Sequence, residues 1–323
     1  MLHNLSAERK QMTSRCRAAF AVTMILALAV CQFAVAATAA KQKTFAGPEE
    51  AVQAAVVAAK NNDDKELLAI FGASAKDLLF SGDAVADKQR RERFLAAYNE
   101  KNAIVTEGES RVITVGNSAW PFPIPLVKSG AGWRFDTEKG REEILNRRIG
   151  ANELDAMQVI LALVDAQREY AMKDRDGDKI FEYARRFRSE AGKKNGLYWE
   201  AKSGAEASPL GPLAAQAQGA GYSTQAPGAG QTAVPYYGYY YKILEGQGKD
   251  APGGAYSYVV NGNMMGGFAF VAFPAEYGNS GVMTFMVNHD GKVFQKNLGA
   301  NTAALAKNMQ VYNPDKTWVE VQP

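Results

Sequence analysis

The apolar run from Ala18 to Ala36 determines where the folded part of this chain begins. Four basic residues and one acidic residue precede it, which is the layout of a secretory signal peptide. The small residues Ala34 and Ala36 fit the export peptidase. We therefore predict a signal peptide over residues 1–36, with Ala39 as a second cleavage position, and a folded protein in the periplasm or another extracytoplasmic space.

Two other interpretations of this segment stay open. The run approaches the length that spans a bilayer, so an uncleaved membrane anchor is the first. A lipid anchor at Cys31 is the second, because the segment from Leu28 to Cys31 resembles the bacterial lipobox. Val30 stands where that motif has a small residue. Cleavage after Ala36 would leave no transmembrane span.

Cleavage would also leave few reactive side chains. Cys16 and Cys31 both lie in the removed segment, so the folded chain would form no disulfide and would depend on packing for stability. His3 is removed as well, which leaves His289. This supply excludes a Cys or His zinc cluster and a Cys/His nucleophile pair. A Ser/His/Asp triad would need His289, but its segment NHDG, residues 288–291, is typical of a hairpin turn. We therefore expect a protein that is not an enzyme.

The charge of the folded chain is balanced. The full sequence has 37 Lys and Arg against 34 Asp and Glu, and the predicted signal peptide holds four of the first kind and one of the second. The numbers of basic and acidic residues that remain after cleavage are equal. Since nucleic-acid binding needs an excess of basic groups, we expect no nucleic-acid partner.

The hydrophobic patterns predict an α+β protein with two domains, residues 37–150 and 151–323. The first begins with helices, the earliest opening at Pro48. Short strands follow, and the prolines of AWPFPIPLV, residues 119–127, predict an edge strand there. A charged helix over 137–149 ends this domain. Helices followed by a curved antiparallel sheet resemble the cone-shaped fold of nuclear-transport-factor-like domains.

The second domain starts with a long amphipathic helix over residues 153–172. Small and polar residues dominate 201–235, which predicts a mobile loop. Five strand candidates and two tight turns then predict an antiparallel meander on which the long helix packs. The strand candidates are YYGYYYKILEG, AYSYVV, GGFAFVAFP, GVMTFMV and KVFQKN, and the turns lie at 261–263 and 288–291.

Several segments resemble an exported bacterial family known only as a domain of unknown function. They are GANELDAMQVILALVDAQREYAM, GLYW, YYGYYYKILEGQGKDAPGGAYSYVVNG, GGFAFVAFPAEYGNSGVMTFMVNHDGKVFQKNLG and DRDGD. The long helix, the loop, the meander and the final FMVNHDGKVF hairpin are also similar to the globular part of type IV pilins and pseudopilins. The polar residues in the long helix depart from the apolar anchoring helix of those proteins, so the resemblance implies a scaffold more than a filament subunit.

An acidic loop is the main metal candidate. Calcium loops alternate oxygen ligands on a tight turn. In DRDGDKIFEYARR, residues 174–186, the ligands in that order are Asp174, Asp176, Asp178, the Ile180 carbonyl and Glu182. Lys179 occupies the position of the EF-hand glycine, and Arg185 that of its bidentate glutamate. A structural calcium would therefore need a shorter variant loop.

Two alternatives to calcium stay open for this loop. Asp178 would cap a helix from about Lys179 to Ser189, with Glu182 near the positive end of its dipole. An acid catalyst would need one carboxyl group in a buried site, whereas aspartates alternating with basic residues on a polar turn indicate exposure.

A tyrosine-rich segment is a second candidate surface, for an unknown envelope protein or glycan. It contains Tyr236, Tyr237, Tyr239, Tyr240 and Tyr241. Strand alternation would place Tyr237, Tyr239 and Tyr241 on one face and the other two on the opposite face. One face would be core, and the other could stack on a sugar ring or on aromatic groups of a partner.

Three functions are compatible with these features. The first is an exported, non-enzymatic envelope protein that binds or scaffolds another envelope component. The second is an accessory pilin-like subunit of a pilus or secretion apparatus. The third is a small-ligand-binding protein, which would have an enclosed apolar pocket near Trp120 and Trp133 in the N-terminal domain.

Overall fold

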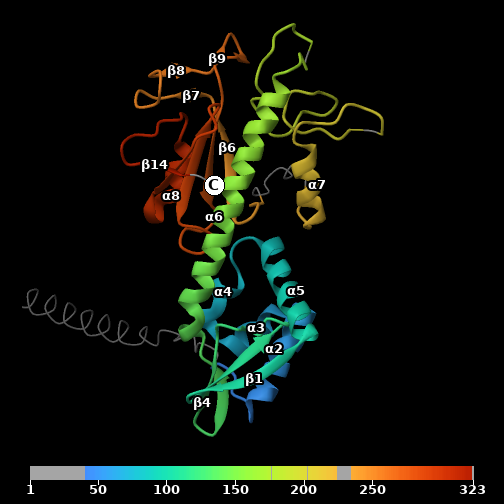
Figure 1. Cartoon of the computed structure of the whole chain (residues 1–323), viewed down its shortest axis with the longest axis vertical. Coiled ribbons are helices and arrows are strands. Elements are labelled where there is room, and N and C mark those ends of the chain that lie inside the picture. The colour runs from blue at the N-terminus through green and yellow to red at the C-terminus, as the bar shows by residue number, and fades with distance from the viewer. Residues whose placement is uncertain (1–40, 176, 202, 224–233, 322–323) are drawn as a thin grey trace, which may run out of the picture. The chain divides into compact units, whose positions relative to one another are not determined.

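The computed structural model describes residues 41–175, 177–201, 203–223 and 234–321. The predicted signal peptide and Asp176 lie outside these ranges. From Gln42 onward the chain groups into one compact unit of helices and antiparallel sheets (Figure 1). The predicted α+β class is confirmed. No helix in the described ranges is long and apolar enough to cross a membrane.

The first part of the unit contains five helical segments and one sheet. The helices are α2 (Pro48–Asn61), α3 (Asp64–Phe71), η1 (Ala73–Ala75), α4 (Lys76–Leu79) and α5 (Ala84–Glu100). The strands are β1 (Asn102–Glu107), β2 (Ser110–Val115), β3 (Trp120–Pro121), β4 (Leu126–Ser129) and β5 (Gly132–Phe135). They pair antiparallel in the order β1-β2-β4-β5, and β3 pairs with β2.

Local signals account for these helices. Pro48 is at the start of α2, and Asn62 ends it in a left-handed conformation. Asp83 caps α5 by accepting a hydrogen bond from the amide of Ala86. The buried alanines and valines of α2 recur at helical spacing and form one hydrophobic core with α3, β2 and β5. The helix predicted from Pro48 is confirmed.

The predicted edge strand over residues 119–127 is wrong in its extent. Pairing stops after Pro121 and resumes at Leu126. The prolines at 121, 123 and 125 have no amide hydrogen, so this segment cannot keep a continuous ladder. It instead folds inward, and Ile124 and Leu126 are buried.

A single helix, α6 (Thr137–Tyr170), replaces the two helices that the sequence predicted on either side of residue 150. Gly150 interrupts neither its hydrogen bonds nor its direction (Figure 1). The C-terminal half of α6 buries residues at helical spacing: Ala156, Val159, Ile160, Leu163 and Val164. This stripe packs against the main C-terminal sheet, where α6 contacts β6, β11 and β12.

The second part of the unit contains short helices and several strands. The helices are α7 (Gly211–Gly219), η2 (Gly299–Asn301) and α8 (Thr302–Asn308). The strands are β6 (Tyr239–Leu244), β7 (Gly246–Gln247), β8 (Tyr256–Ser257), β9 (Val259–Val260), β10 (Asn263–Met264), β11 (Ala269–Pro274), β12 (Met283–Asn288), β13 (Val293–Asn297) and β14 (Val319–Val321).

The main sheet is antiparallel in the order β14-β13-β12-β11-β6, which confirms most of the predicted meander. One strand candidate, AYSYVV at 255–260, is not part of it. That segment divides at the buried Tyr258 into β8, which pairs with β7, and β9, which pairs with β10. Asn261 and Gly262 both have positive φ and form the two-residue turn between β9 and β10. Residues 289–292 connect β12 to β13, as the turn at 288–291 predicted.

The segment 201–235 is not wholly a loop. Residues 202 and 224–233 lie outside the described ranges, and among the others Gly211–Gly219 forms α7. Pro212 stands in its first turn, where a missing amide hydrogen costs nothing. The abundance of alanine, which we took as a sign of a loop, also favours a helix.

Candidate functional site: an apolar cavity with arginines in its wall

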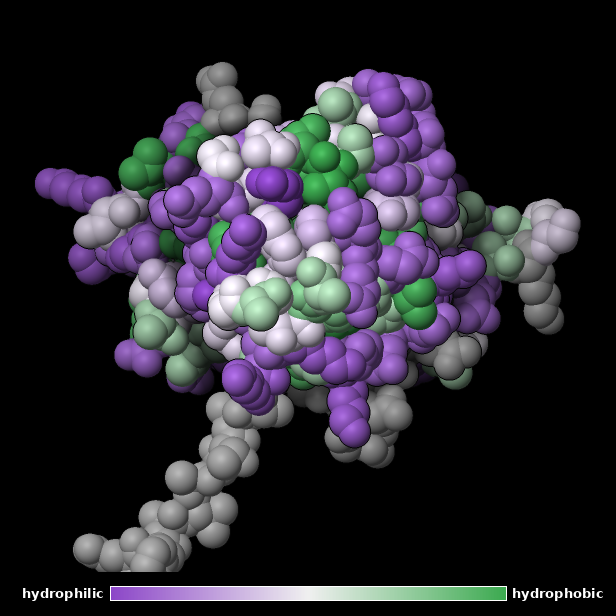
Figure 2. Space-filling view, turned by 90° about the horizontal axis from the view of Figure 1, so that it is seen from below, coloured by the Kyte–Doolittle hydropathy of each residue, from purple (hydrophilic) through white to green (hydrophobic). Residues whose placement is uncertain are grey.

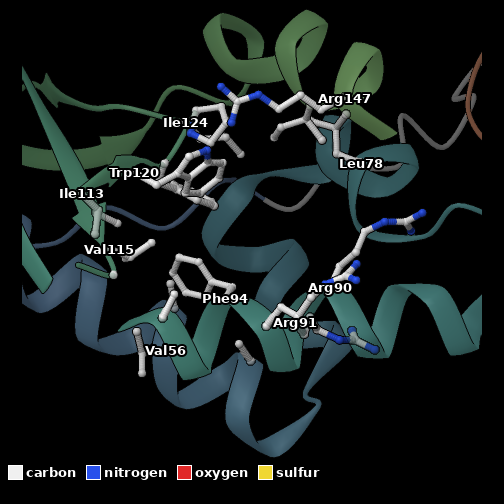
Figure 3. A pocket seen from close by; sticks show the side chains of 18 of the residues that line it. Val56, Leu78, Arg90, Arg91, Phe94, Ile113, Val115, Trp120, Ile124 and Arg147 are labelled. Carbon is white, nitrogen blue, oxygen red and sulfur yellow. The ribbon is translucent and has the colours of Figure 1, made fainter. Parts of the chain in front are cut away.

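A cavity of about 760 Å³ lies among the N-terminal elements (Figure 3). Its wall comes from α2, α3, α5, β2, the proline-rich segment after β3 and the first half of α6. Figure 3 shows Ile113, Val115 and Trp120 on one side, Arg90 and Arg91 on the opposite side, and Phe94 between them. Most of the wall is apolar, and the cavity is partly open to solvent.

Small side chains leave this space unfilled. The wall includes five alanines, and all of them belong to helical segments: Ala55, Ala59, Ala75, Ala97 and Ala151. The larger apolar groups, among them Phe71, Phe94 and Phe122, stand around the space and contact one another, with ring centroids 5.2 to 6.3 Å apart. The folded segment between β3 and β4 adds Phe122 and Ile124 to the wall.

Trp120 lies at one side of the cavity and is 38% exposed. The guanidinium of Arg147 on α6 stacks over its ring at 5.0 Å from the centroid, and the same guanidinium is 2.5 Å from a carboxylate oxygen of Glu143. Trp133 is not part of the wall; it packs under Arg111 and Lys128. The expected pocket therefore exists near Trp120 alone.

The cavity wall contains five arginines and one acidic residue, Glu100. We call four of these arginines, Arg90, Arg91, Arg93 and Arg148, the arginine wall. Glu100 is the last residue of α5, and its carboxylate accepts a hydrogen bond from the side chain of Asn117.

Three members of the arginine wall come from α5. Arg90 donates to a carboxylate oxygen of Asp87 at 2.8 Å and to the side-chain oxygen of Asn152 at 3.0 Å. Arg91 is 2.7 Å from a carboxylate oxygen of Asp64, and its Nε is buried without an acceptor. Arg93 has no hydrogen-bond or ion-pair partner in the part of the chain that the structure describes, although its charge acts on Asp155.

Arg148 on α6 is 5% exposed. Its Nη atoms donate to the carbonyl oxygens of Asp77 and Leu78 and to the side-chain oxygen of Asn279. Its Nε has no acceptor, and among the described residues no carboxylate forms an ion pair with it. Burial and then the charge of Arg90 lower the pKa of the Arg148 guanidinium to about 10. It therefore remains a cation at neutral pH, with neutral acceptors only.

The acidic loop does not lead into the helix that the cap interpretation predicted. No helix begins at Lys179. The Tyr183 amide donates to the Met264 carbonyl at 2.8 Å, and the side chain of Gln167 exchanges two hydrogen bonds with the backbone of Ala184. The backbone groups of Tyr183 and Ala184 bond to Met264 and Gln167 and not to residues four positions away, as they would in a helix. The helix-cap interpretation is therefore wrong.

The predicted calcium ligands that the structure describes accept hydrogen bonds from the chain. Asp174 accepts from the amides of Gly177 and Lys179, at 2.7 and 2.9 Å. Asp178 accepts from the Ile180 amide and the Asn263 side chain, and Glu182 accepts from the Met264 amide. No group of three acidic, His or Cys side chains is placed to hold a metal among the described residues, which do not include Asp176. The calcium site stays a prediction.

The tyrosine-rich segment is a strand only in part. Tyr236 and Tyr239 exchange backbone hydrogen bonds across a two-residue turn, in which Tyr237 and Gly238 both have positive φ. The predicted strand positions of Tyr236 and Tyr237 are therefore wrong. From Tyr239 the chain forms the strand β6, as predicted, but burial along it does not alternate. Tyr239 is fully buried and donates to the Met283 carbonyl at 3.0 Å.

The other strand tyrosines are half-buried. Tyr240 packs against Phe273, with ring centroids 5.7 Å apart, and the Tyr241 hydroxyl donates to the Tyr236 carbonyl. The segment therefore offers mostly core and turn contacts. A partner surface at these residues stays a prediction.

Sequence patterns did not reveal the arginine wall. Three of its members lie within KQRRERF, residues 88–94, and Arg148 lies 55 residues after Arg93. The only hint was the density of arginine on a helix that also needed an apolar face. The wall of this cavity offers apolar contacts, guanidinium donors and one carboxylate, a set of groups that can hold and orient a molecule.

A family model described as "Protein of unknown function (DUF2950)" covers residues 42–321. No curated protein and no solved structure matches the chain.

Proposed function

We propose that this chain, which belongs to the family described as "Protein of unknown function (DUF2950)", binds a small molecule with an apolar body in its N-terminal cavity. The observation that carries this proposal is the cavity itself. Its volume of about 760 Å³ lies within the range of small-molecule sites in proteins. Its apolar wall with a few polar groups is also typical of such sites.

The distribution of apolar groups supports binding inside the fold. On the face that Figure 2 shows, hydrophilic residues predominate and hydrophobic residues form small separate groups. The cavity wall, in contrast, brings together apolar side chains from α2, α5 and β2. A ligand that removed this wall from water would gain roughly 25 cal/mol for each Å² of apolar surface buried.

A matched pair of variants tests the proposal. Val56 lines the cavity, whereas its neighbour Val57 is 46% exposed and does not. We expect the neutral fluorescent probe N-phenyl-1-naphthylamine to bind the parent chain and the Val57→Trp variant. Val56→Trp should fill the cavity and abolish binding. Equal binding by both variants would place the probe elsewhere and would contradict the proposal.

A second proposal concerns the C-terminal part, as an exported scaffold that holds an envelope protein or glycan. Its support is the packing of α6 on the antiparallel sheet, the arrangement that the pilin-like resemblance implied. The sequence layout of residues 1–36 supports export. A pull-down from envelope extract tests it: recovery of pilin-like or secretion-apparatus subunits would favour an accessory subunit. A chain recovered without partners would count against the scaffold.

A further inference from the structure

We propose that the cavity takes an amphipathic anion, whose carboxylate or phosphate head binds at the arginine wall while its hydrocarbon body fills the apolar part. This inference rests on the proposed small-molecule function and names the class of ligand. Three observations on the cavity wall carry it.

The first observation is the charge of the wall. Five arginines line the cavity against one acidic residue, Glu100. Among the described residues, the carboxylates that form ion pairs with the arginine wall are Asp87 and Asp64, and neither lines the cavity. A ligand inside would therefore meet guanidinium groups before it met a carboxylate. Because the cavity wall is mostly apolar, a charge there is screened less than on the surface.

The second observation is a pair of donors without acceptors. The Nε atoms of Arg91 and Arg148 are both buried, and neither has a hydrogen-bond partner among the residues that the structure describes. A buried donor that lacks an acceptor costs about 1 to 3 kcal/mol, and proteins rarely leave one so. Both donors belong to side chains in the cavity wall. Carboxylate and phosphate oxygens are the acceptors that guanidinium donors bind most strongly.

The third observation is that Arg148 is a buried cation whose direct partners are neutral. In the described part of the chain, the hydrogen bonds of its guanidinium end on neutral oxygens, while the charges of Asp87, Asp77 and Glu276 act on it without forming an ion pair. A buried charge without an ion pair is unfavourable, and a ligand that supplies the opposite charge reduces this penalty. Arg90 adds a second positive charge close enough to lower the pKa of Arg148. An anion between them would relieve this repulsion.

The geometry divides the ligand into two parts. Figure 3 shows Arg90 and Arg91 on one side of the cavity and Ile113, Val115 and Trp120 on the other. The head would lie toward α5 and α6, and the hydrocarbon body toward β2. A ligand without the anionic head would leave the arginines unpaired, and a ligand without the hydrocarbon body would leave the apolar side exposed to water.

Four ten-carbon probes measured on the full chain test this inference by calorimetry. They are decanoate, decyl phosphate, decanol and decyltrimethylammonium. We expect decanoate and decyl phosphate to bind at least about ten-fold more tightly than decanol, as charge-assisted hydrogen bonds would produce. The cation should bind most weakly. The ratio of the decanoate affinity to the decyl phosphate affinity identifies the head group. The preference for anions should fall as the salt concentration rises.

Variants of α5 locate the head group. Arg91→Gln removes a guanidinium that, within the described ranges, forms an ion pair with the exposed Asp64 alone, so the chain should still fold. We expect this variant to lose roughly three- to ten-fold in decanoate affinity and little in decanol affinity. Lys88→Gln is the matched control, because Lys88 is exposed on the same helix and does not line the cavity. Arg91→Lys keeps the positive charge but not the planar guanidinium. Its decanoate affinity should fall between those of the parent chain and Arg91→Gln.

The outcomes separate the two proposals. Equal affinity for decanol and decanoate would overturn the anionic class and leave the small-molecule function intact. Absence of binding by all four probes would overturn both. An anion preference that Arg91→Gln and Lys88→Gln reduce equally would show that the head binds outside the arginine wall, which also overturns the inference.

Discussion

The carboxylate of Asp83 accepts a hydrogen bond of 2.9 Å from the backbone amide of Gly238, a residue 155 positions later in the chain. It also accepts from the Tyr222 hydroxyl at 2.8 Å and caps α5 through the Ala86 amide at 3.0 Å. Asp83 is fully buried. One side chain therefore joins the start of a cavity helix to the turn before β6.

This relationship predicts a large loss of stability in Asp83→Ala. The variant removes a helix cap and leaves two buried donors, Tyr222 and Gly238, without an acceptor, which should cost about 3 to 5 kcal/mol. Asp63→Ala is the control, since Asp63 caps α3 at an exposed position and should cost about 1 kcal/mol. Urea unfolding measures both. Equal losses would mean that the long-range bonds contribute nothing.

Two glycines of α6 should respond in opposite directions to alanine. A Cβ at Gly140 would lie 2.7 Å from the carbonyl oxygen of Pro123, whereas nothing lies within 4 Å of a Cβ at Gly150. We expect Gly140→Ala to lose about 1 to 3 kcal/mol through forced displacement of the segment after β3. Gly150→Ala should gain about 0.5 to 1 kcal/mol from helix propensity. A gain for both variants in urea unfolding would show that this close approach is not tight.

Glu206 makes stability depend on acid pH. Hydrogen bonds from Lys173 and Lys194, at 2.8 and 2.7 Å, lower the pKa of its carboxyl from 4.5 to about 2. A lowered folded pKa stabilises the protein above the unfolded value, and that contribution is lost as the pH falls from 4.5 toward 2. The side chain is 32% exposed, so we expect no more than about 1 kcal/mol at pH 7.

The measurement compares Glu206→Gln with the parent chain from pH 7 to pH 2. The variant should be less stable at pH 7 and equal at pH 2. Glu200→Gln, which loses the exposed ion pair with Arg188, is the control and should change little at any pH. A constant difference across the range would mean that the Glu206 charge has no role.

The acidic loop predicts a response to calcium. A cation that binds only the folded state must raise the melting temperature, by a stabilisation of about 2.7 kcal/mol at one hundred times the dissociation constant. Calorimetry with millimolar calcium and then with chelator measures it. Asp174→Asn should abolish the shift. Asp165→Asn is the control and should keep it, because Asp165 lies outside the loop and its side chain is 79% exposed. No shift in the parent chain would exclude the calcium site.

The features that the sequence predicted correctly are those set by neighbouring residues. The start of α2 depends on Pro48 and the end on Asn62, and the strands of the main sheet follow from apolar runs between tight turns. Predictions failed where distant groups compete for the backbone. Gln167 and Met264 take the hydrogen-bonding groups of residues 183–184, so a segment with a good helix cap remains extended.

The candidate site shows the same division. Sequence alone determined the supply of chemistry: under the predicted cleavage no cysteine and one histidine remain, and those numbers do not depend on folding. Only the tertiary structure decided that Val56, Phe94 and Ile113 enclose a space, and that Arg91 and Arg148 face it from different helices. The reason is physical. A cavity and the arginines in its wall are brought together by the packing of segments that lie far apart in the chain. Local periodicity contains no information on the distances between those segments.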